Sequence, residues 1–241
     1  MHRSYLDQTL PTPAENLACD EALLDLCDSG DLPGVLRFWE APAYFIVLGY
    51  SNQARREVDL DACAAQGFPV LRRCSGGGTV LQGPGCLNYS LILEIQGTPA
   101  FETIRQTTEY ILNQHEKAIA ALLPDPVATQ GLSDLTWQGL KFSGNAQRRK
   151  RRALLFHGTF LYRFDLPLIG KVLPLPSREP DYRNGRPHDQ FLINLPVAAE
   201  KIKAALRHQW HALSPLSSIP QTQIARLCAE KYSQQAWNFK F

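Results

Sequence analysis

Apolar residues recur at helical spacing in several stretches of the chain. The longest runs from residue 101 to residue 123, where one helical face carries Ile104, Ile111, Leu112, Ile119 and Leu122. His115 lies on the same face, so we interpret it as a core histidine rather than a ligand. The same spacing, with turn residues as end signals, predicts helices over residues 14–28, 54–67, 197–212 and 220–232.

Shorter apolar runs, bounded by glycine, proline and polar turn residues, predict strands between these helices. They cover residues 35–40, 43–50, 69–74, 87–95 and 153–164. Their order does not follow a regular strand–helix–strand series. We therefore predict an α+β fold, in which a mixed β-sheet is flanked by helices within a single domain over residues 1–241.

The charge and apolar composition of the chain limit the kinds of molecule it is expected to bind. The chain has a formal net charge of +2 and 20% charged residues, which predicts neither nucleic-acid nor membrane-surface binding. No apolar run approaches the length of a membrane span, and the first residues lack the apolar core of a signal peptide, so we expect a cytoplasmic protein. The six cysteines form no CxxC pair and indicate neither a zinc site nor a disulfide framework.

The segment RRCSGGGTVLQGPG, residues 72–85, concentrates glycines behind two arginines. Successive glycines let backbone N–H groups approach a ligand closely, and Arg72 or Arg73 can supply charge to a phosphate or carboxylate. The segment matches neither the Walker phosphate loop nor the dinucleotide fingerprint. The alternative interpretation is a tight hairpin, which seldom uses three glycines in a row beside two arginines. The pattern favours a loop that binds a small anion.

A second polar segment, residues 139–162, carries Lys141 ahead of a small-residue loop at residues 143–145, then a basic run at residues 148–152. A lysine on a constrained loop can offer its ammonium group to a developing oxyanion, and the loop can offer donors to phosphate. The basic run is interpreted as a solvated turn, with a nucleic-acid patch as the alternative.

Several motifs together resemble the lipoate–protein ligase A family, whose catalytic domain is shared with octanoyltransferases and biotin ligases. They are NLACDEALL, RFWEAPAYFIVLGYSN, RRCSGGGTV, KFSGNAQ followed by FHGT, and AEKYSQQAWN, in an order that spans nearly the whole chain. The resemblance implies activation of lipoate or octanoate by ATP and Mg²⁺ to an acyl-AMP, then transfer to a lysine of a lipoyl-carrier protein. The first alternative is ATP-independent transfer from an acyl carrier protein or another lipoyl domain. The second is a non-catalytic binding module.

The resemblance also implies roles for individual residues. Lys141 matches the catalytic lysine that contacts the acyl carbonyl and the adenylate phosphate, and Asp134 matches an element near the metal and phosphates. The implied acyl-binding residues are Arg72, Ser75, Gly76, Gly77, Gly78, His157, Gly158 and Thr159. The implied nucleotide-binding residues are Asp134, Ser143, Gly144, Asn145, Ala146 and either Arg148 or Arg149.

Some features depart from the family pattern. Residues 82–86 read Gln-Gly-Pro-Gly-Cys where many ligases carry His-Asp, and residues 176–195 have no clear counterpart, so they form either a surface loop or an active-site cover. The C-terminal accessory domain of larger ligases has no equivalent in the sequence, so either a separate accessory polypeptide supplies it or one domain performs the whole reaction.

The cysteines bear on the choice between ligase and transferase. One octanoyltransferase branch has its nucleophilic cysteine at the position of Leu154, and another has it upstream of the lysine loop. No cysteine occurs between Cys86 and Cys228, which leaves Cys74 and Cys86 as the thiols closest to the motifs. Neither branch keeps its nucleophile there. The sequence therefore predicts dependence on ATP.

Overall fold

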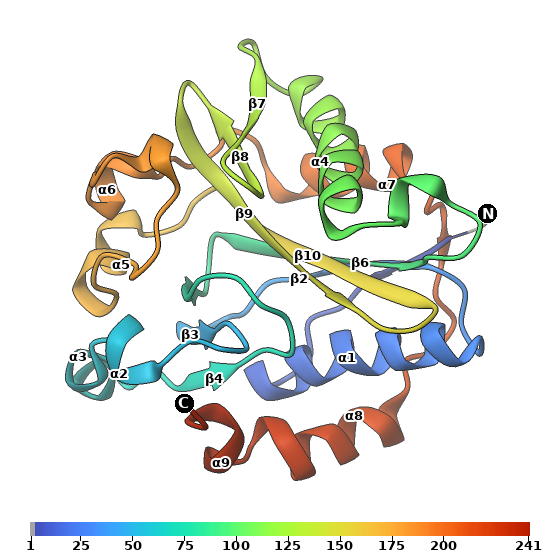
Figure 1. The fold of residues 1–241 in the computed structure, drawn as a ribbon, viewed down its shortest axis with the longest axis horizontal. Helices are drawn as coiled ribbons and strands as arrows, with labels where there is room; N and C mark the ends of the chain where they lie inside the picture. The colour runs from blue at the N-terminus through green and yellow to red at the C-terminus, as the bar shows by residue number, and fades with distance from the viewer. Residues whose placement is uncertain (1–2) are drawn as a thin grey trace.

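The fold is built around an eight-stranded sheet. The computed structural model describes residues 3–241 (Figure 1). The strands follow the order β11–β1–β2–β6–β10–β9–β8–β7. Strand β1 pairs in parallel with β2 and β11, and the remaining neighbours are antiparallel. In chain order the strands are β1 (Ser4–Asp7), β2 (Val35–Trp39), β6 (Cys86–Glu94), β7 (Val127–Gln130), β8 (Asp134–Trp137), β9 (Leu140–Arg149), β10 (Ala153–Leu161) and β11 (Ser214–Pro215).

A second sheet holds three short strands, in the order β4 (Val70–Arg72), β3 (Phe45–Leu48) and β5 (Val80–Gln82). Strand β3 is the central strand and pairs in parallel with β4 and antiparallel with β5. Because β4 and β5 lie on opposite sides of β3, residues 73–79 must cross the end of β3 to connect them. The glycine segment is therefore not a tight hairpin between paired strands.

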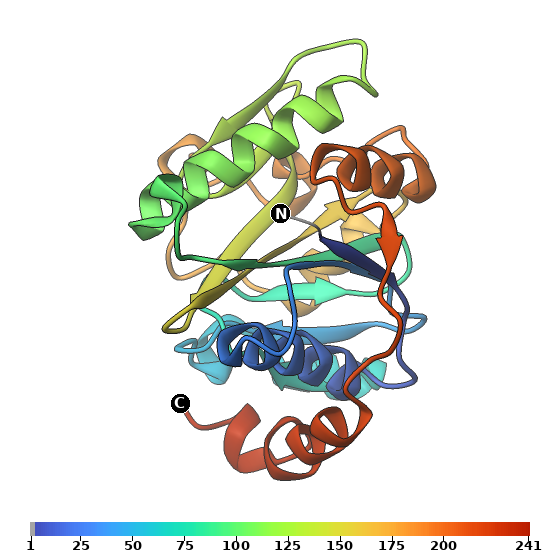
Figure 2. The same ribbon diagram turned by 90° about the vertical axis from the view of Figure 1, so that its right-hand side faces the viewer.

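Helices cover both faces of the large sheet. Figure 2 shows α4 (Ile104–Ala120) and α7 (Ala199–Gln209) on one side, with α1 (Pro13–Ser29) and α8 (Gln221–Leu227) on the other. Each pair buries its own apolar cluster against the sheet. Among the described helices, none is long and apolar enough to cross a bilayer. The remaining helical segments are short and comprise α2 (Ala54–Glu57), α3 (Leu60–Gln66), η1 (Pro99–Phe101), α5 (Leu166–Val172), η2 (Asp181–Arg183), α6 (His188–Phe191), η3 (Cys228–Tyr232) and α9 (Gln235–Asn238).

The mixed sheet and its flanking helices confirm the predicted α+β class, but some boundaries differ. The helix expected over residues 54–67 is two helices, because Val58 between them adopts an extended conformation. The helix expected over residues 101–123 begins at Ile104 behind the N-cap Thr103, which leaves Ile104 63% exposed. Residues 143–145, expected as a loop, lie within strand β9.

His115 is a core residue, as predicted. It is fully buried on α4, its ring lies edge-on to Tyr89 at a centroid distance of 4.7 Å, and neither ring nitrogen has a hydrogen-bond partner among the described residues. Burial disfavours the charged imidazolium and lowers the pKa of His115 to about 3.

We expect His115→Phe to make the protein less sensitive to acid. Unfolded histidine titrates near pH 6.5, so between about pH 6.5 and 3 the unfolded state binds a proton that the folded state does not. The stability associated with neutral His115 is therefore complete above pH 6.5 and is lost as the pH falls towards 3. As the pH falls through this window, the unfolding free energy of the variant should therefore decrease less steeply than that of the original protein. The difference in slope should be up to about 1.4 kcal/mol per pH unit. Urea unfolding at several pH values measures both slopes, and equal slopes would contradict the expectation.

Candidate active site

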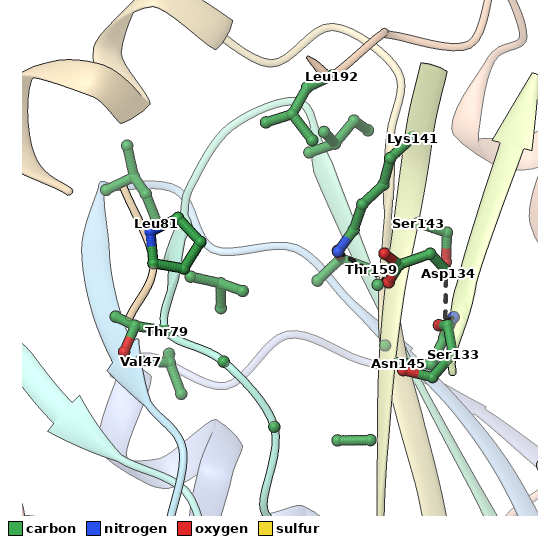
Figure 3. Close-up of a pocket in the computed structure, with 18 of the residues that line it drawn as sticks. Val47, Thr79, Leu81, Ser133, Asp134, Lys141, Ser143, Asn145, Thr159 and Leu192 are labelled. Atoms are coloured by element: carbon green, nitrogen blue, oxygen red, sulfur yellow. Dashed lines mark hydrogen bonds and ion pairs between the residues drawn. The ribbon is translucent and has the colours of Figure 1, made fainter. Parts of the chain in front are cut away.

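A pocket of about 830 Å³ lies between the two sheets (Figure 3). Its walls come from β3 and β5 of the small sheet, from β6, β8, β9 and β10 of the large sheet, and from the chain around residues 176–192. The sequence-predicted site residues that line it are Gly77, Gly78, Asp134, Lys141, Ser143, Gly144, Asn145, Ala146, His157, Gly158 and Thr159. Segments that are far apart in sequence therefore meet at one cavity.

Lys141 and Asp134 form an ion pair in the pocket. Lys141 lies on strand β9 rather than on the expected loop, and its Nζ is 2.8 Å from Asp134 Oδ1 on the neighbouring strand β8. The pairing of these strands slips by one residue between Leu135 and Thr136, a bulge of the kind often found beside active sites. A Cβ at residue 144 would come within 2.9 Å of Lys141 Nζ, so glycine there leaves room for the ammonium group.

The glycine loop is folded around Arg73. Its guanidinium donates to the carbonyl oxygens of Gly76 at 2.6 Å and Gly78 at 2.8 Å, while Nε donates to Ser75 Oγ at 3.1 Å. Gly77 adopts φ +87°, in the left-handed region that favours glycine. Gly77 and Gly78 line the pocket, whereas Ser75, which is buried, and Gly76, which is exposed, are not among its lining residues. Arg73, which the resemblance did not single out, thus fixes the loop that faces the ligand space.

Arg72 is placed elsewhere, which corrects its expected position in the acyl pocket. It is fully buried, and its guanidinium donates to backbone carbonyls of residues 49, 50 and 52 and of Trp237 and Asn238. Arg72 therefore joins strand β4 to helix α9. The guanidinium directs all of its hydrogen bonds at backbone carbonyl oxygens and also lies over the Phe241 ring, so its role in the described structure is to hold the fold together.

Two further arginines also lie outside the pocket. Arg149 donates to Thr107 Oγ1 and to the carbonyl oxygen of Phe101, and Arg148 lies over the Tyr50 ring at 5.8 Å. Both belong to strand β9, so only residues 150–152 of the basic run form the expected turn. The structure brings neither arginine to the cavity wall described above.

His157 connects the glycine loop to a buried carboxylate. Its Nε2 lies 2.5 Å from Ser75 Oγ, and its Nδ1 lies 4.0 Å from Asp20 Oδ2. Asp20 in turn pairs with Arg37 at 2.5 Å, and both side chains are buried. Burial, with a contribution from the Arg73 charge, lowers the pKa of His157 to about 3. The imidazole is therefore neutral at ordinary pH and can accept the Ser75 hydroxyl proton in a hydrogen bond.

The segment over residues 176–195, called the cover below, forms part of the pocket wall and is therefore not only a surface loop. Tyr182, Arg183, Phe191 and Leu192 are among its lining residues. The Tyr182 hydroxyl donates to Asp134 Oδ2 at 2.8 Å. Sequence reasoning missed Tyr182 because nothing in its neighbourhood signals a partner 48 residues earlier in the chain.

The described residues offer limited means to hold a metal ion. They contain no group of three or more His, Cys, Asp or Glu side chains arranged around a common point. Asp134, the predicted metal-binding residue, already uses one oxygen for Lys141 and the other for Tyr182. A magnesium ion often keeps several waters and binds through one carboxylate and substrate phosphates, so Asp134 fits as a single ligand to a nucleotide-borne ion.

The cysteines lie apart from the pocket. Within the part of the chain that the structure describes, no cysteine is among the residues that line it. Cys74 and Cys86 are buried, and burial raises the pKa of each thiol to about 12. Burial at both positions disfavours the thiolate, the form in which cysteine acts as a nucleophile.

Comparison with solved structures identifies the fold. A bi-partite lipoate protein ligase from Thermoplasma acidophilum superposes with a TM-score of 0.84 at 23% identity, covering 99% of this chain and 96% of that one. A lipoate-protein ligase A bound with ATP gives a TM-score of 0.84 at 23% identity, covering 99% of both chains. The α+β fold is thus that of the lipoate ligases, as the sequence resemblance implied.

Sequence comparison gives relatives that align with this chain over nearly their full length. The octanoyltransferase LipM of Lysinibacillus sphaericus is 30% identical to this chain, with 98% of each sequence covered. The octanoyltransferase LipM of Geobacillus kaustophilus is 27% identical, covering 98% of this chain and 97% of the relative. The model of the lipoyl protein ligase A/B catalytic domain matches residues 12–202. The chain, with its lysine-bearing pocket between two sheets, belongs to the lipoyl protein ligase A/B catalytic domain family.

Proposed function

We propose that the protein attaches a lipoyl or octanoyl group, through an amide bond, to a lysine of a lipoyl-carrier protein. The observation that carries this proposal is the Lys141 ammonium group, held by Asp134 in a pocket that Gly77 and Gly78 of the glycine loop also line. A cation that lines a pocket can stabilise negative charge that develops on a reacting carbonyl or phosphate. The pocket also shields an activated acyl group from water until the acceptor amine arrives.

The absence of a pocket thiol among residues 3–241 favours activation by ATP. In this reaction the acid's carboxylate attacks the α-phosphate of ATP, pyrophosphate leaves, and an acyl-AMP forms. The carrier lysine then attacks the acyl carbonyl and AMP leaves, with the amine proton released. Lys141 would stabilise the charge on the phosphate and the carbonyl oxygen, a contact typically worth about 2–4 kcal/mol. Mg²⁺ bound to the nucleotide would neutralise further phosphate charge, with Asp134 as its protein ligand.

Octanoyl transfer from an acyl carrier protein is the alternative, and the relatives support it better than they support the ATP-dependent route. It is favoured by the names of the relatives, which are octanoyltransferases at up to 30% identity over nearly the full chain. In a transferase of this kind a nucleophile takes the acyl group from the carrier thioester before the lysine accepts it. The buried Cys74 and Cys86 are poorly placed for that step, since their thiols do not line the described pocket.

One experiment separates the two donors. The purified protein is incubated with a lipoyl-carrier domain and either lipoate with MgATP, octanoate with MgATP, or octanoyl-acyl carrier protein without ATP. Mass spectrometry then measures acylation of the carrier. Acylation only in the first two mixtures supports the ligase, and acylation in the third establishes the transferase. A protein that transfers no acyl group in any mixture, with or without a candidate accessory polypeptide, would refute the proposal.

Changing Cys74 and Cys86 together to serine is expected to leave the acylation rate within about threefold of the unmodified protein. The reason is that the acyl-AMP route forms no thioester, and both cysteines serve as small buried side chains. The same three donor mixtures provide the measurement, with thermal unfolding as the control for the fold. Complete loss of ATP-independent transfer in this variant would identify a cysteine nucleophile instead.

A further inference from the structure

We propose that Tyr182 is a positioning residue, which acts through Asp134 to hold the Lys141 ammonium group at its place in the pocket. The inference rests on the proposed role of Lys141. According to this proposal, the cover not only lines the pocket but also helps to position the catalytic lysine. Three observations support it: the shared carboxylate, the rigid frame around Tyr182, and a second contact between the cover and Lys141.

The first observation is that one carboxylate connects the two side chains. Asp134 Oδ1 lies 2.8 Å from Lys141 Nζ, and Asp134 Oδ2 accepts the Tyr182 hydroxyl at 2.8 Å. Asp134 is only 6% exposed, so water has little access to replace either partner. The hydroxyl therefore limits rotation of the carboxylate about χ2 and keeps Oδ1 facing the ammonium group.

The second observation is that Tyr182 is itself held rigidly. Its ring packs against Phe191 at a centroid distance of 5.2 Å. Arg183 and Arg186 each donate to the other's backbone carbonyl, and Arg186 also donates to the carbonyl of Tyr182. These bonds close the turn around η2, so the hydroxyl is presented by a fixed frame.

The third observation is a backbone contact from the far end of the cover. Leu192 forms a parallel bridge with Lys141, and the Ile193 N–H donates to the Lys141 carbonyl at 3.0 Å. The cover thus holds the Lys141 backbone directly and its side chain through Asp134. Substituting Tyr182 by phenylalanine removes only the second of these contacts and keeps the ring that packs on Phe191.

The test compares Tyr182→Phe with Tyr110→Phe, a half-exposed tyrosine on α4 that serves as the control. We expect Tyr182→Phe to lower kcat for acyl transfer about tenfold, with KM for the acid and the melting temperature close to their original values. In an Asp134→Asn background the same change should have no further effect, because the connection is already broken. A kcat within twofold of the original, or the same fold-loss in both backgrounds, would overturn the inference.

A second measurement does not depend on activity. In ¹H–¹⁵N spectra recorded for lysine ammonium groups, a held Lys141 should give a slowly exchanging signal, assigned by its absence in Lys141→Ala. We expect Tyr182→Phe to broaden or remove this signal and Tyr110→Phe to retain it. An unchanged signal in Tyr182→Phe would contradict the positioning role. Full activity of Lys141→Ala would instead refute the proposed function, so the two failures are distinguishable.

Discussion

Replacing Lys141 with alanine is expected to slow acyl transfer by about 100- to 1000-fold while the protein still folds. The ammonium group is the cation paired to Asp134 in the pocket, and its removal leaves the developing negative charge without this partner. The Lys141 side chain is 26% exposed and contributes little packing, but its removal leaves the buried Asp134 carboxylate without its cation, so we expect a protein that folds with a lower unfolding free energy. The measurement is the single-turnover rate of carrier acylation at saturating donor.

A matched control for this change is Lys203→Ala. Lys203 is also a partly exposed lysine in ion pairs, with Asp7 and Glu200, but it lies on α7. The Lys203→Ala change should leave the acylation rate unchanged. This control distinguishes an effect specific to the pocket from a general effect of removing a positive charge. A Lys141→Ala protein that acylates the carrier at close to the original rate would remove the central assignment.

The second large effect is expected at Gly77, and not at its neighbour Gly76. Alanine at residue 77 must adopt φ +87°, and its Cβ would lie 2.8 Å from Arg73 Nη2 and 3.2 Å from the Ala146 Cβ. This strain should lower the unfolding free energy by about 1–3 kcal/mol. Displacement of Arg73 should also break its hydrogen bonds to the Gly76 and Gly78 carbonyls, disturb the loop, and weaken acyl binding by about tenfold or more.

Gly76→Ala provides the comparison within the same loop. A Cβ at residue 76 would have no described atom within 4 Å, so we expect near-original stability and binding. Calorimetry with lipoate and urea unfolding of both variants measure the difference. If the two alanine variants behave alike, the loop's conformation does not depend on its middle glycine, and its glycine content reflects only the need for open space.

The sequence motifs located the pocket-forming strands, but not the direction of every side chain. Arg72 and Arg73 are adjacent at the end of β4, and neighbouring side chains of a strand point to opposite faces. One of them therefore had to face the pocket and the other the interior. Choosing between them requires the register of β4 against β3 and the position of helix α9, neither of which follows from local sequence.

Strand β9 illustrates a different limit. Residues 143–145, Ser-Gly-Asn, have the composition of a loop, yet they lie between two paired strands. Their small size is explained by side chains from elsewhere, since Gly144 leaves space for the Lys141–Asp134 pair. Tertiary contacts overrode local propensity here. The same applies to Tyr182, whose partner is defined only once the cover packs on the sheet.

The position of Arg72 also constrains when the pocket can be completed during synthesis. The arginine stands at the base of the glycine loop, and its carbonyl partner Asn238 is 166 residues later in the chain. When synthesis has produced the last strand of the large sheet, the carbonyl groups of α9 that accept hydrogen bonds from Arg72 have not yet been made. Contacts of such long sequence separation form late, because the intervening chain must first be ordered. The glycine loop therefore gains its final support only when residues 237 and 238 have left the ribosome.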